Sequence, residues 1–227
     1  MRKIILVLGL AILSSRLYAG IISTWNFDGG SPAFGSSYTE WWESGYLCPN
    51  GNMNEGKYSI VDDSSTVHEA FKPVFHGHTT GSDNFMLLNG YDGVGGADPA
   101  FFTIDLSGLI QGETYTFSFF AANAYGGTIP CAMPINPSEL GVKLVGSGAY
   151  INTFQLPTTL GAWQQYSVSF VAPGPGGHLG VYDLNRELWG NDFAFDDAAI
   201  NAPEPSAWTF LTAGLFTLCL LRRSRGA

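Results

Sequence analysis

Basic residues are scarce in this sequence, and most of them lie at its two ends. Six of the ten lysines and arginines fall within 1–16 and 222–225, so residues 20–202 hold four basic residues against eighteen acidic ones, a formal net charge of −14. Such a segment repels nucleic acid and anionic lipid, and its self-repulsion favours solubility. It can attract cations where carboxylates converge. Its length suits one domain with an ample core.

Motifs of common enzyme families are absent as well. The sequence contains no Gly-x-Ser-x-Gly elbow, no His-Glu-x-x-His pair and no phosphate loop. Paired carboxylates for glycosidic cleavage stay open, since eighteen acids always offer candidates. We expect a protein that is not an enzyme and has no catalytic residues.

Three histidines are the one cluster that resembles a reactive site. His68, His76 and His78 are close in sequence, and strand alternation would place His76 and His78 on one face of an extended segment. With Asp83 or Glu69 they could form a metal or acid–base site. The alternative, which we favour, is that these histidines are structural.

Both ends carry an apolar segment beside basic residues. The N-terminus combines a basic start, an apolar run over 4–13 and a cleavage site at Leu17-Tyr18-Ala19. This pattern predicts that 1–19 is a signal peptide, removed before Gly20.

The C-terminal segment is a short apolar helix between two signals. Pro203-Glu204-Pro205 precedes it, and Arg222, Arg223 and Arg225 follow it. About fifteen residues at a rise of 1.5 Å span about 22 Å, less than a hydrocarbon core of about 30 Å. We therefore expect a marginal transmembrane helix with its arginines on the cytoplasmic side. An ordinary core helix is the alternative, but such a helix should be amphipathic, and this one is apolar on every face.

The order of these signals over 202–227 resembles the PEP-CTERM sorting tail of Gram-negative bacteria. The resemblance implies transient anchoring in the inner membrane until an exosortase cuts near Pro203-Glu204-Pro205. It implies that the protein then reaches the cell surface or the extracellular matrix, with the exosortase and the export machinery as partners.

Cysteine is rare, with three residues in the chain. Cys219 lies in the tail, which leaves Cys48 and Cys131 in the domain. An even pair in an exported domain favours a disulfide, worth about 4–5 kcal/mol in the chain-entropy model. Two free buried thiols are the alternative. A metal site is not expected, because neither cysteine has a close cysteine or histidine partner.

Between the ends, the sequence alternates as β-strands do and shows no helical period. Tyr115, Phe117 and Phe119 share one face of a strand, and Tyr166, Val168 and Phe170 share one face of another. The pattern predicts an all-β antiparallel β-sandwich of jelly-roll type over 20–201. The other expected strands cover 21–27, 57–61, 84–88, 100–106, 140–145, 150–155, 178–182 and 193–200.

Several phrases of this region resemble the galactose-binding-like jelly rolls of extracellular bacterial proteins, which are akin to carbohydrate-binding modules. They are the segments Val67–Phe71, His78–Ser82, Asn84–Gly90, Leu109–Asn123 and the closing Gly190–Asp197. The resemblance implies a module that binds glycans in many cases, although many relatives have no known ligand, so fold does not determine function.

The same resemblance implies a structural calcium ion between the first and last strands. Its acids would be Asp28 and one of Asp196 and Asp197, because alternation points these two neighbours to opposite faces unless a bulge intervenes. Calcium needs six to eight oxygen ligands. The alternative is that these acids are ordinary solvated residues.

Aromatic residues in loops are the candidates for glycan binding, because sugar rings stack on flat aromatic faces. Asp92, Asn123 and Asn191 would bond sugar hydroxyls. One of the two adjacent tryptophans is expected to be buried. The alternatives to polysaccharide binding are a structural component of the exopolysaccharide or biofilm matrix, or a secreted glycan-active enzyme. The candidate aromatics are Trp41, Trp42, Tyr46, Tyr91, Tyr125 and Trp189.

Overall fold

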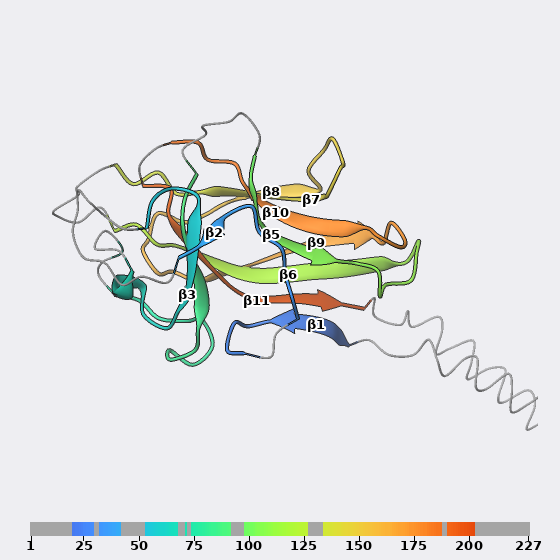
Figure 1. Cartoon of the computed structure of the whole chain (residues 1–227), viewed down its shortest axis with the longest axis horizontal. Coiled ribbons are helices and arrows are strands. Elements are labelled where there is room, and N and C mark those ends of the chain that lie inside the picture. The colour runs from blue at the N-terminus through green and yellow to red at the C-terminus, as the bar shows by residue number, and fades with distance from the viewer. Residues whose placement is uncertain are drawn as a thin grey trace, which may run out of the picture.

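The computed structural model describes residues 20–29, 32–41, 53–67, 71, 74–91, 98–126, 134–187 and 190–202. Over these residues the chain forms two packed β-sheets and a single 3-10 turn, η1 (Ser64–Thr66), with no α-helix (Figure 1). The expected all-β sandwich is confirmed. Asp63 caps η1, and its carboxylate accepts a hydrogen bond from the Ser65 amide at 2.7 Å.

The larger sheet has the order β2-β3-β4-β11-β6-β9, and β1 also pairs with β11. The smaller sheet has the order β5-β10-β7-β8. The strands of the larger sheet are β1 (Ile21–Trp25), β2 (Thr39–Glu40), β3 (Lys57–Val61), β4 (Phe85–Asn89), β6 (Thr114–Asn123), β9 (Gln164–Val171) and β11 (Phe193–Asn201). Those of the smaller sheet are β5 (Ala100–Asp105), β7 (Glu139–Leu144), β8 (Asn152–Gln155) and β10 (His178–Asp183).

From β4 onward the chain alternates between the sheets, with β7 and β8 as the one consecutive pair within a sheet. Such crossings are the connections of a jelly roll. All strand pairs are antiparallel except β2 with β3. Every strand expected from the sequence is present. Its ends are shifted by at most two residues, except that β6 continues three residues beyond the alternation expected over 113–120. The two-residue β2 was missed, because so short a segment has no period to detect.

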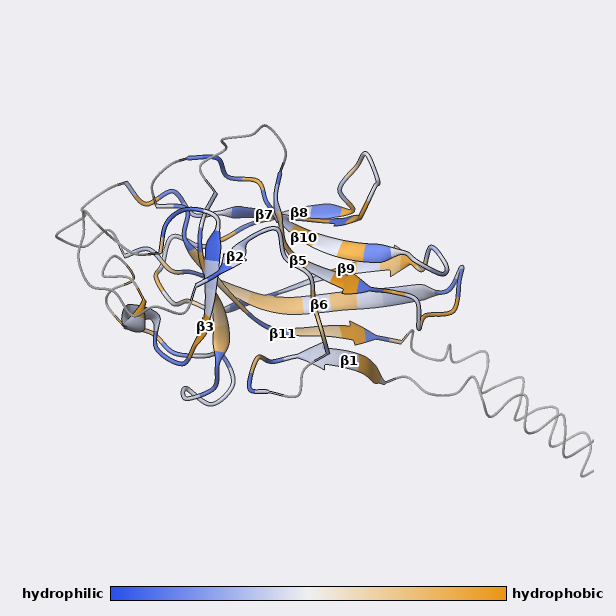
Figure 2. Ribbon diagram, in the orientation of Figure 1, coloured by the Kyte–Doolittle hydropathy of each residue, from blue (hydrophilic) through white to orange (hydrophobic). Residues whose placement is uncertain are grey.

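The core fills the space between the sheets with aromatic side chains. Phe117, Phe119 and Phe195 are fully buried, and the expected inward faces of β6 and β9 are confirmed. Alternation of apolar and polar residues is visible along β10 (Figure 2). Burying each such side chain stabilises the fold by about 1.5–3 kcal/mol. A smaller cluster around Phe71, Phe85 and Leu87 covers the other face of β4, which is therefore buried on both sides.

The first and last described strands lie side by side. β1 pairs with the C-terminal half of β11, with Trp25 opposite Ala198. In its pairing with β6, the strand β11 has a register shift between Asp196 and Ala199, and Asp197 adopts a positive φ of 47°. Such a bulge re-aims side chains, and here it acts on two of the acids predicted to bind calcium.

Candidate functional site

The described ends of four connections that carry the predicted glycan-contacting aromatics lie at one end of the sandwich, which we name the loop end. They are the connections β2–β3, β4–β5, β6–β7 and β10–β11. Backbone and side-chain hydrogen bonds join their described parts. The Ala124 amide donates to the Asp192 carbonyl at 2.9 Å, and the Asn89 side chain donates to the Met53 carbonyl.

Two buried carboxylates lie beneath the loop end. Asp183 accepts hydrogen bonds from the Tyr38 hydroxyl and from the Tyr91 amide, each at 3.0 Å. Asp192 accepts one from the Gly90 amide at 3.2 Å. These two acids therefore hold Gly90 and Tyr91, the residues that directly follow β4, against the sandwich.

Burial makes both acids hold their protons more tightly. Asp183 and Asp192 are 1% and 6% exposed. Burial raises the pKa of Asp183 to about 7, although its hydrogen bonds act to lower it. Burial also raises the pKa of Asp192 to about 7, and the charge of Asp183 adds to the effect. Burial, followed by the charge of Asp183, raises the pKa of Tyr38 as well. Proton loss near neutral pH would therefore place charge under the loop end.

The described aromatics of the loop end pack into the protein rather than standing free. Trp41 is half-buried against the smaller cluster, and the Lys57 ammonium lies 3.7 Å from its ring centroid. Tyr91 is half-buried against the main core. Tyr125 is 3% exposed, which corrects the prediction for this residue, because a buried ring has no face to offer a sugar.

Two of the predicted polar partners are structural. Asn123 and Asn191 are 0% and 1% exposed, so neither can bond a sugar hydroxyl. The Asn123 side chain instead donates to the carbonyls of Tyr125, at 2.9 Å, and Thr158, at 3.1 Å. Four other predicted contacts lie outside the described residues: Trp42, Tyr46, Asp92 and Trp189.

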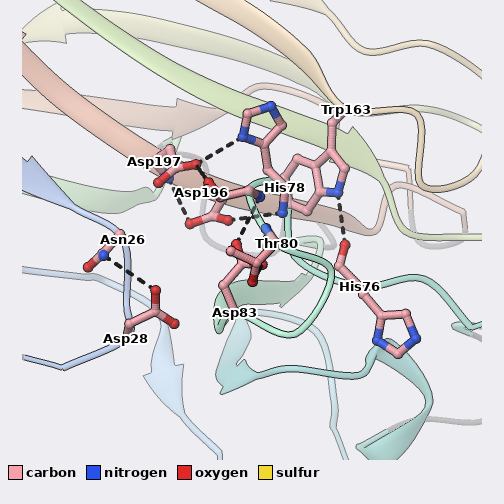
Figure 3. A network of polar contacts seen from close by, with 10 residues as sticks. Asn26, Asp28, His76, His78, Thr80, Asp83, Trp163, Asp196 and Asp197 are labelled. Carbon is pink, nitrogen blue, oxygen red and sulfur yellow. Dashed lines mark hydrogen bonds and ion pairs between the residues drawn. The ribbon is translucent and has the colours of Figure 1, made fainter.

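The predicted calcium acids Asp196 and Asp197 point to one loop (Figure 3). Asp196 accepts a hydrogen bond from the His78 amide at 3.3 Å. Asp197 accepts one from Nδ1 of His78 at 2.9 Å and another from the Thr79 hydroxyl. The bulge at Asp197 thus overrides the alternation that would separate these neighbours.

The third acid predicted for calcium, Asp28, contacts the far end of the same loop. Its Oδ1 accepts a hydrogen bond from the Asn84 amide at 2.7 Å, and its Oδ2 accepts one from the Asn26 side chain at 3.3 Å. Carboxylate oxygens suit calcium in kind. Among the described residues, no group of three or more His, Cys, Asp or Glu side chains lies close enough together to hold a metal ion. Calcium binding therefore stays a prediction of the sequence.

The acids around this loop differ in their affinity for protons. Burial, followed by the charges of Asp197 and Asp83, raises the pKa of Asp196 to about 8. Burial also acts to raise the pKa of Asp83, but hydrogen bonds from Thr79 and Thr80 outweigh it and lower that pKa. The pKa values of these two acids are therefore shifted in opposite directions, although both contact the same loop.

His76 and His78 do not share a face, which corrects the expectation from alternation. The His78 ring stacks on Phe120 with centroids 3.4 Å apart and bonds Asp197. The exposed His76 ring points away, and its Nδ1 lies 2.8 Å from the Asp62 carbonyl (Figure 3). His78 therefore fastens the loop to the larger sheet, which accords with a structural role. His68 and Glu69 lie outside the described residues.

The outer face of the smaller sheet holds a cluster that the sequence analysis missed. Lys143 has its ammonium 4.4 Å from the Tyr150 ring centroid and 4.2 Å from that of Tyr182. A Cβ atom at Gly141 or at Gly180 would lie 2.7 Å from the ring of Tyr150 or of Tyr182, respectively. These two glycines therefore make room for two aromatic rings against the sheet.

Two further charged residues border these rings. Asp98 accepts hydrogen bonds from the Tyr150 hydroxyl and from Nη2 of Arg186, each at 2.6 Å. Partial burial acts to raise the pKa of Asp98, but these hydrogen bonds outweigh it and lower that pKa. We name the cluster the tyrosine–lysine patch: Tyr150, Tyr182, Lys143, Asp98 and Arg186. Its signal in the sequence was that two of the domain's four basic residues, Lys143 and Arg186, lie within seven residues of Tyr150 and Tyr182, respectively.

The predictions for the two ends and for the disulfide fall on residues beyond those described. They concern 1–19, the sorting motif Pro203-Glu204-Pro205, the apolar segment after it, and Cys48 with Cys131. In the described part of the chain, no helix is both long and apolar enough to cross a membrane.

No family model and no curated protein matches the sequence. Solved structures do share part of its architecture. The CBM22-1 xylan-binding domain of Paenibacillus barcinonensis Xyn10C has 10% identity and a TM-score of 0.47, over 83% of this chain and 97% of that one. The carbohydrate-binding module CBM6cm-2 of Cellvibrio mixtus lichenase 5A has 14% identity and a TM-score of 0.38, over 82% and 100%. The sugar-binding EclA C-terminal domain has 22% identity and a TM-score of 0.36, over 45% and 67%. At such identities and TM-scores, these likenesses add no argument about ligand or activity.

Proposed function

We propose that residues 20–202 form a non-catalytic module that binds extracellular polysaccharide on the tyrosine–lysine patch. The observation that carries the proposal is the half-buried ring of Tyr150, which packs over Gly141 on the outer face of the smaller sheet and against the buried ring of Tyr182. Saccharide sites combine aromatic faces with a few placed polar groups, and the patch has both. Tyr150 is half-buried, so part of its ring is accessible.

Each residue of the patch has a distinct part in this proposal. The ring of Tyr150 stacks on the apolar face of a sugar. Lys143 and Arg186 donate hydrogen bonds to hydroxyl oxygens, and Asp98 accepts one from a hydroxyl. The hydrogen bond from Tyr150 to Asp98 fixes the ring before the ligand arrives, which lowers the entropy cost of binding.

The proposal extends to the location of the protein. The basic and apolar start over 1–19 supports export, and the Pro-Glu-Pro, apolar and arginine order over 202–227 supports a sorting tail cut by an exosortase. Between these steps the chain is anchored in the inner membrane, and afterwards it lies at the cell surface or in the matrix. Polysaccharide of that matrix is the ligand available there.

A second function, a structural matrix component without a specific ligand, is favoured by a different observation. Trp41 and Tyr91 are half-buried, and Tyr125 is buried, so the described loop-end aromatics act mainly in packing. The loop end also remains the competing surface for a ligand, because Trp42, Tyr46 and Trp189 belong to its loops.

The deciding experiment is a glycan-array screen of the purified chain, followed by calorimetry with the glycan that it retains. Tyr150→Ala should weaken binding about tenfold or more, because the stacking surface is lost. The matched control Tyr91→Ala removes the same side chain at the loop end and should leave affinity unchanged. Thermal unfolding of both variants checks that they are folded.

Other outcomes assign the function differently. Loss of binding in Tyr91→Ala alone would move the ligand to the loop end. Absence of binding to every glycan in the screen would overturn the proposal in favour of the structural component. Turnover of a retained glycan would show a glycan-active enzyme.

A further inference from the structure

The β8–β9 flank of the sandwich is the side where each sheet ends in an uncharged strand. Among the described strands, β9 pairs with β6 alone, and β8 pairs with β7 alone. The two edges are adjacent, since the rings of Phe154 and Tyr166 lie 5.0 Å apart. Residues 144–182, which contain both strands, include no Asp, Glu, Lys or Arg. In a domain of net charge −14, this is where another acidic molecule can approach with the least repulsion.

β9 has the features of a strand that accepts a further strand. Its eight residues pair with β6 in an unbroken register and contain no proline, glycine or charge. Proteins usually block edge strands with lysine, proline, bulges or short length, because unpaired amides and carbonyls attract other strands. None of these devices is present in β9. The other edge on this flank, β8, has four residues and is a poorer template.

The remaining edges of the described sheets are blocked. The backbone of Gly35 exchanges hydrogen bonds with Thr103 at 2.8 and 2.7 Å, which covers the edge of β5. The edge of β3 is covered by β2, a two-residue strand that carries the exposed Glu40. β1 has five residues and a register shift in its pairing with β11. Among the described strands, β9 therefore stands out as long, regular and open.

We propose that β9 is the docking edge for a second copy of this chain, with the two β9 strands antiparallel around a two-fold axis. The two larger sheets then continue into one sheet across the dimer. Such an axis places the outer faces of the two larger sheets on the same side of the dimer. Residues that lie directly opposite each other in the two β9 strands then share a face. Ser167 therefore lies opposite Ser167 or Ser169 of the second copy, so that small, uncharged residues meet.

A second copy of this chain suits the β9 edge better than a strand of arbitrary sequence does. A two-fold axis brings the neutral flank of one molecule to the neutral flank of the other, and the acids of both stay outside the contact. This inference is independent of glycan binding, because the tyrosine–lysine patch lies on the outer face of the other sheet.

The test uses charge at two exposed outer-face positions of β9, in the full chain. One variant combines Ser167→Lys with Ser169→Lys, a second combines Ser167→Asp with Ser169→Asp, and the matched control combines Ser167→Thr with Ser169→Thr. Ser118, the β6 residue opposite Ser167, is uncharged, so the fold should tolerate these changes. Light scattering coupled to size-exclusion chromatography gives the mass of each species.

We expect the wild type and the threonine control to be dimers. The lysine and aspartate variants should each dissociate, with a dissociation constant raised about tenfold or more, because like charges lie opposite one another. An equimolar mixture of these two variants should recover the dimer, since opposite charges then meet.

Three results would each overturn the proposal. The wild type could be monomeric at the highest soluble concentration, or the charged variants could keep its mass. The mixture could also stay monomeric while each variant alone is monomeric and folded by its thermal unfolding. Every variant keeps both chain ends. If the chain associates through these ends, the charged variants will keep the wild-type mass, which would overturn the proposal.

Discussion

Asp196 and Asp197 are neighbours in β11, yet both carboxylates bond the residues that follow Gly77. Asp196 accepts from the His78 amide, and Asp197 accepts from the His78 ring. The cause is the register shift after Asp196, with Asp197 at a φ of 47°. One local change of backbone direction therefore fastens a loop more than a hundred residues away in sequence to the last strand.

Removing His78 should destabilise the domain. His78→Ala loses the hydrogen bond to Asp197 and the stacking on Phe120, which together are worth about 1–3 kcal/mol. His76→Ala is the matched control and should change stability by less than about 0.5 kcal/mol, because its ring is exposed. Urea unfolding measures both. Equal losses would show that the ring of His78 does not fasten the loop.

Calcium should stabilise the domain through Asp28 and one of Asp196 and Asp197, as the sequence resemblance implies. The gain should be about 2.7 kcal/mol when free calcium is a hundredfold above its dissociation constant. Asp28→Ala should abolish the gain and leave the calcium-free fold intact. The measurement is the melting temperature of chelator-treated protein with and without millimolar calcium. An unchanged melting temperature would contradict calcium binding. The hydrogen bonds that Asp28, Asp196 and Asp197 make to the loop before β4 would then be the link between the first and last strands.

Stability should fall as the pH rises from about 4 to about 7. The pKa of Asp183 and that of Asp192 are each raised from 3.8 to about 7, so the folded state binds these protons more tightly than the unfolded chain. Their stabilising contribution is complete below about pH 4 and is lost as the pH rises through about 7. The change is on the order of 4 kcal/mol for each carboxyl.

Two substitutions test whether Asp183 and Asp192, rather than other acids, cause this loss of stability with rising pH. Asp183→Asn and Asp192→Asn remove the titration and still accept hydrogen bonds, so each should flatten the decline in urea-unfolding free energy between pH 4 and pH 7. The pKa of Asp83 is lowered, so its stabilising contribution is lost only as the pH falls below about 4. A wild-type profile with no slope between pH 4 and pH 7 would contradict the assignment.

Cys48 and Cys131 should be joined by a disulfide. They belong to the β2–β3 and β6–β7 connections, which are two of the four loops of the loop end. Reducing agent should therefore lower the melting temperature, and the serine double variant should be insensitive to it. A thiol titration that finds both cysteines reactive without reductant would exclude the bond.

The mature protein should lack both apolar ends. Export predicts loss of 1–19, and exosortase cleavage near Pro203-Glu204-Pro205 predicts loss of the tail. Mass spectrometry of protein recovered from the extracellular fraction is the measurement. Intact peptides from 208–227 in that fraction would argue against removal of the tail.

Predictions from alternation agree with the structure within the regular strands β6 and β9. They failed for His76 and His78, which lie outside any strand, and for Asp196 and Asp197, which lie at a bulge. The inward faces Tyr115–Phe117–Phe119 and Tyr166–Val168–Phe170 were readable because the side-chain period of a strand is local. Predictions about single positions in loops were less reliable. The sequence predicts that Tyr125 lies in a loop, which it does, but it closely follows the buried end of β6 and its ring is buried. The tyrosine–lysine patch was missed because Tyr150 reaches across to Tyr182 and Asp98, which lie in other parts of the sequence.

Local sequence patterns were enough to predict a β-sandwich, the positions of nearly all its strands, and a strongly acidic domain. These properties follow from period, composition and charge, which need no knowledge of distant neighbours. The tertiary structure alone decided that Asp183 meets Tyr38, that Asp196 and Asp197 serve one loop, and that β9 is an open edge. Each of these depends on which strands become neighbours, because strand pairing joins residues far apart in the chain and burial then changes the chemistry of the groups it encloses.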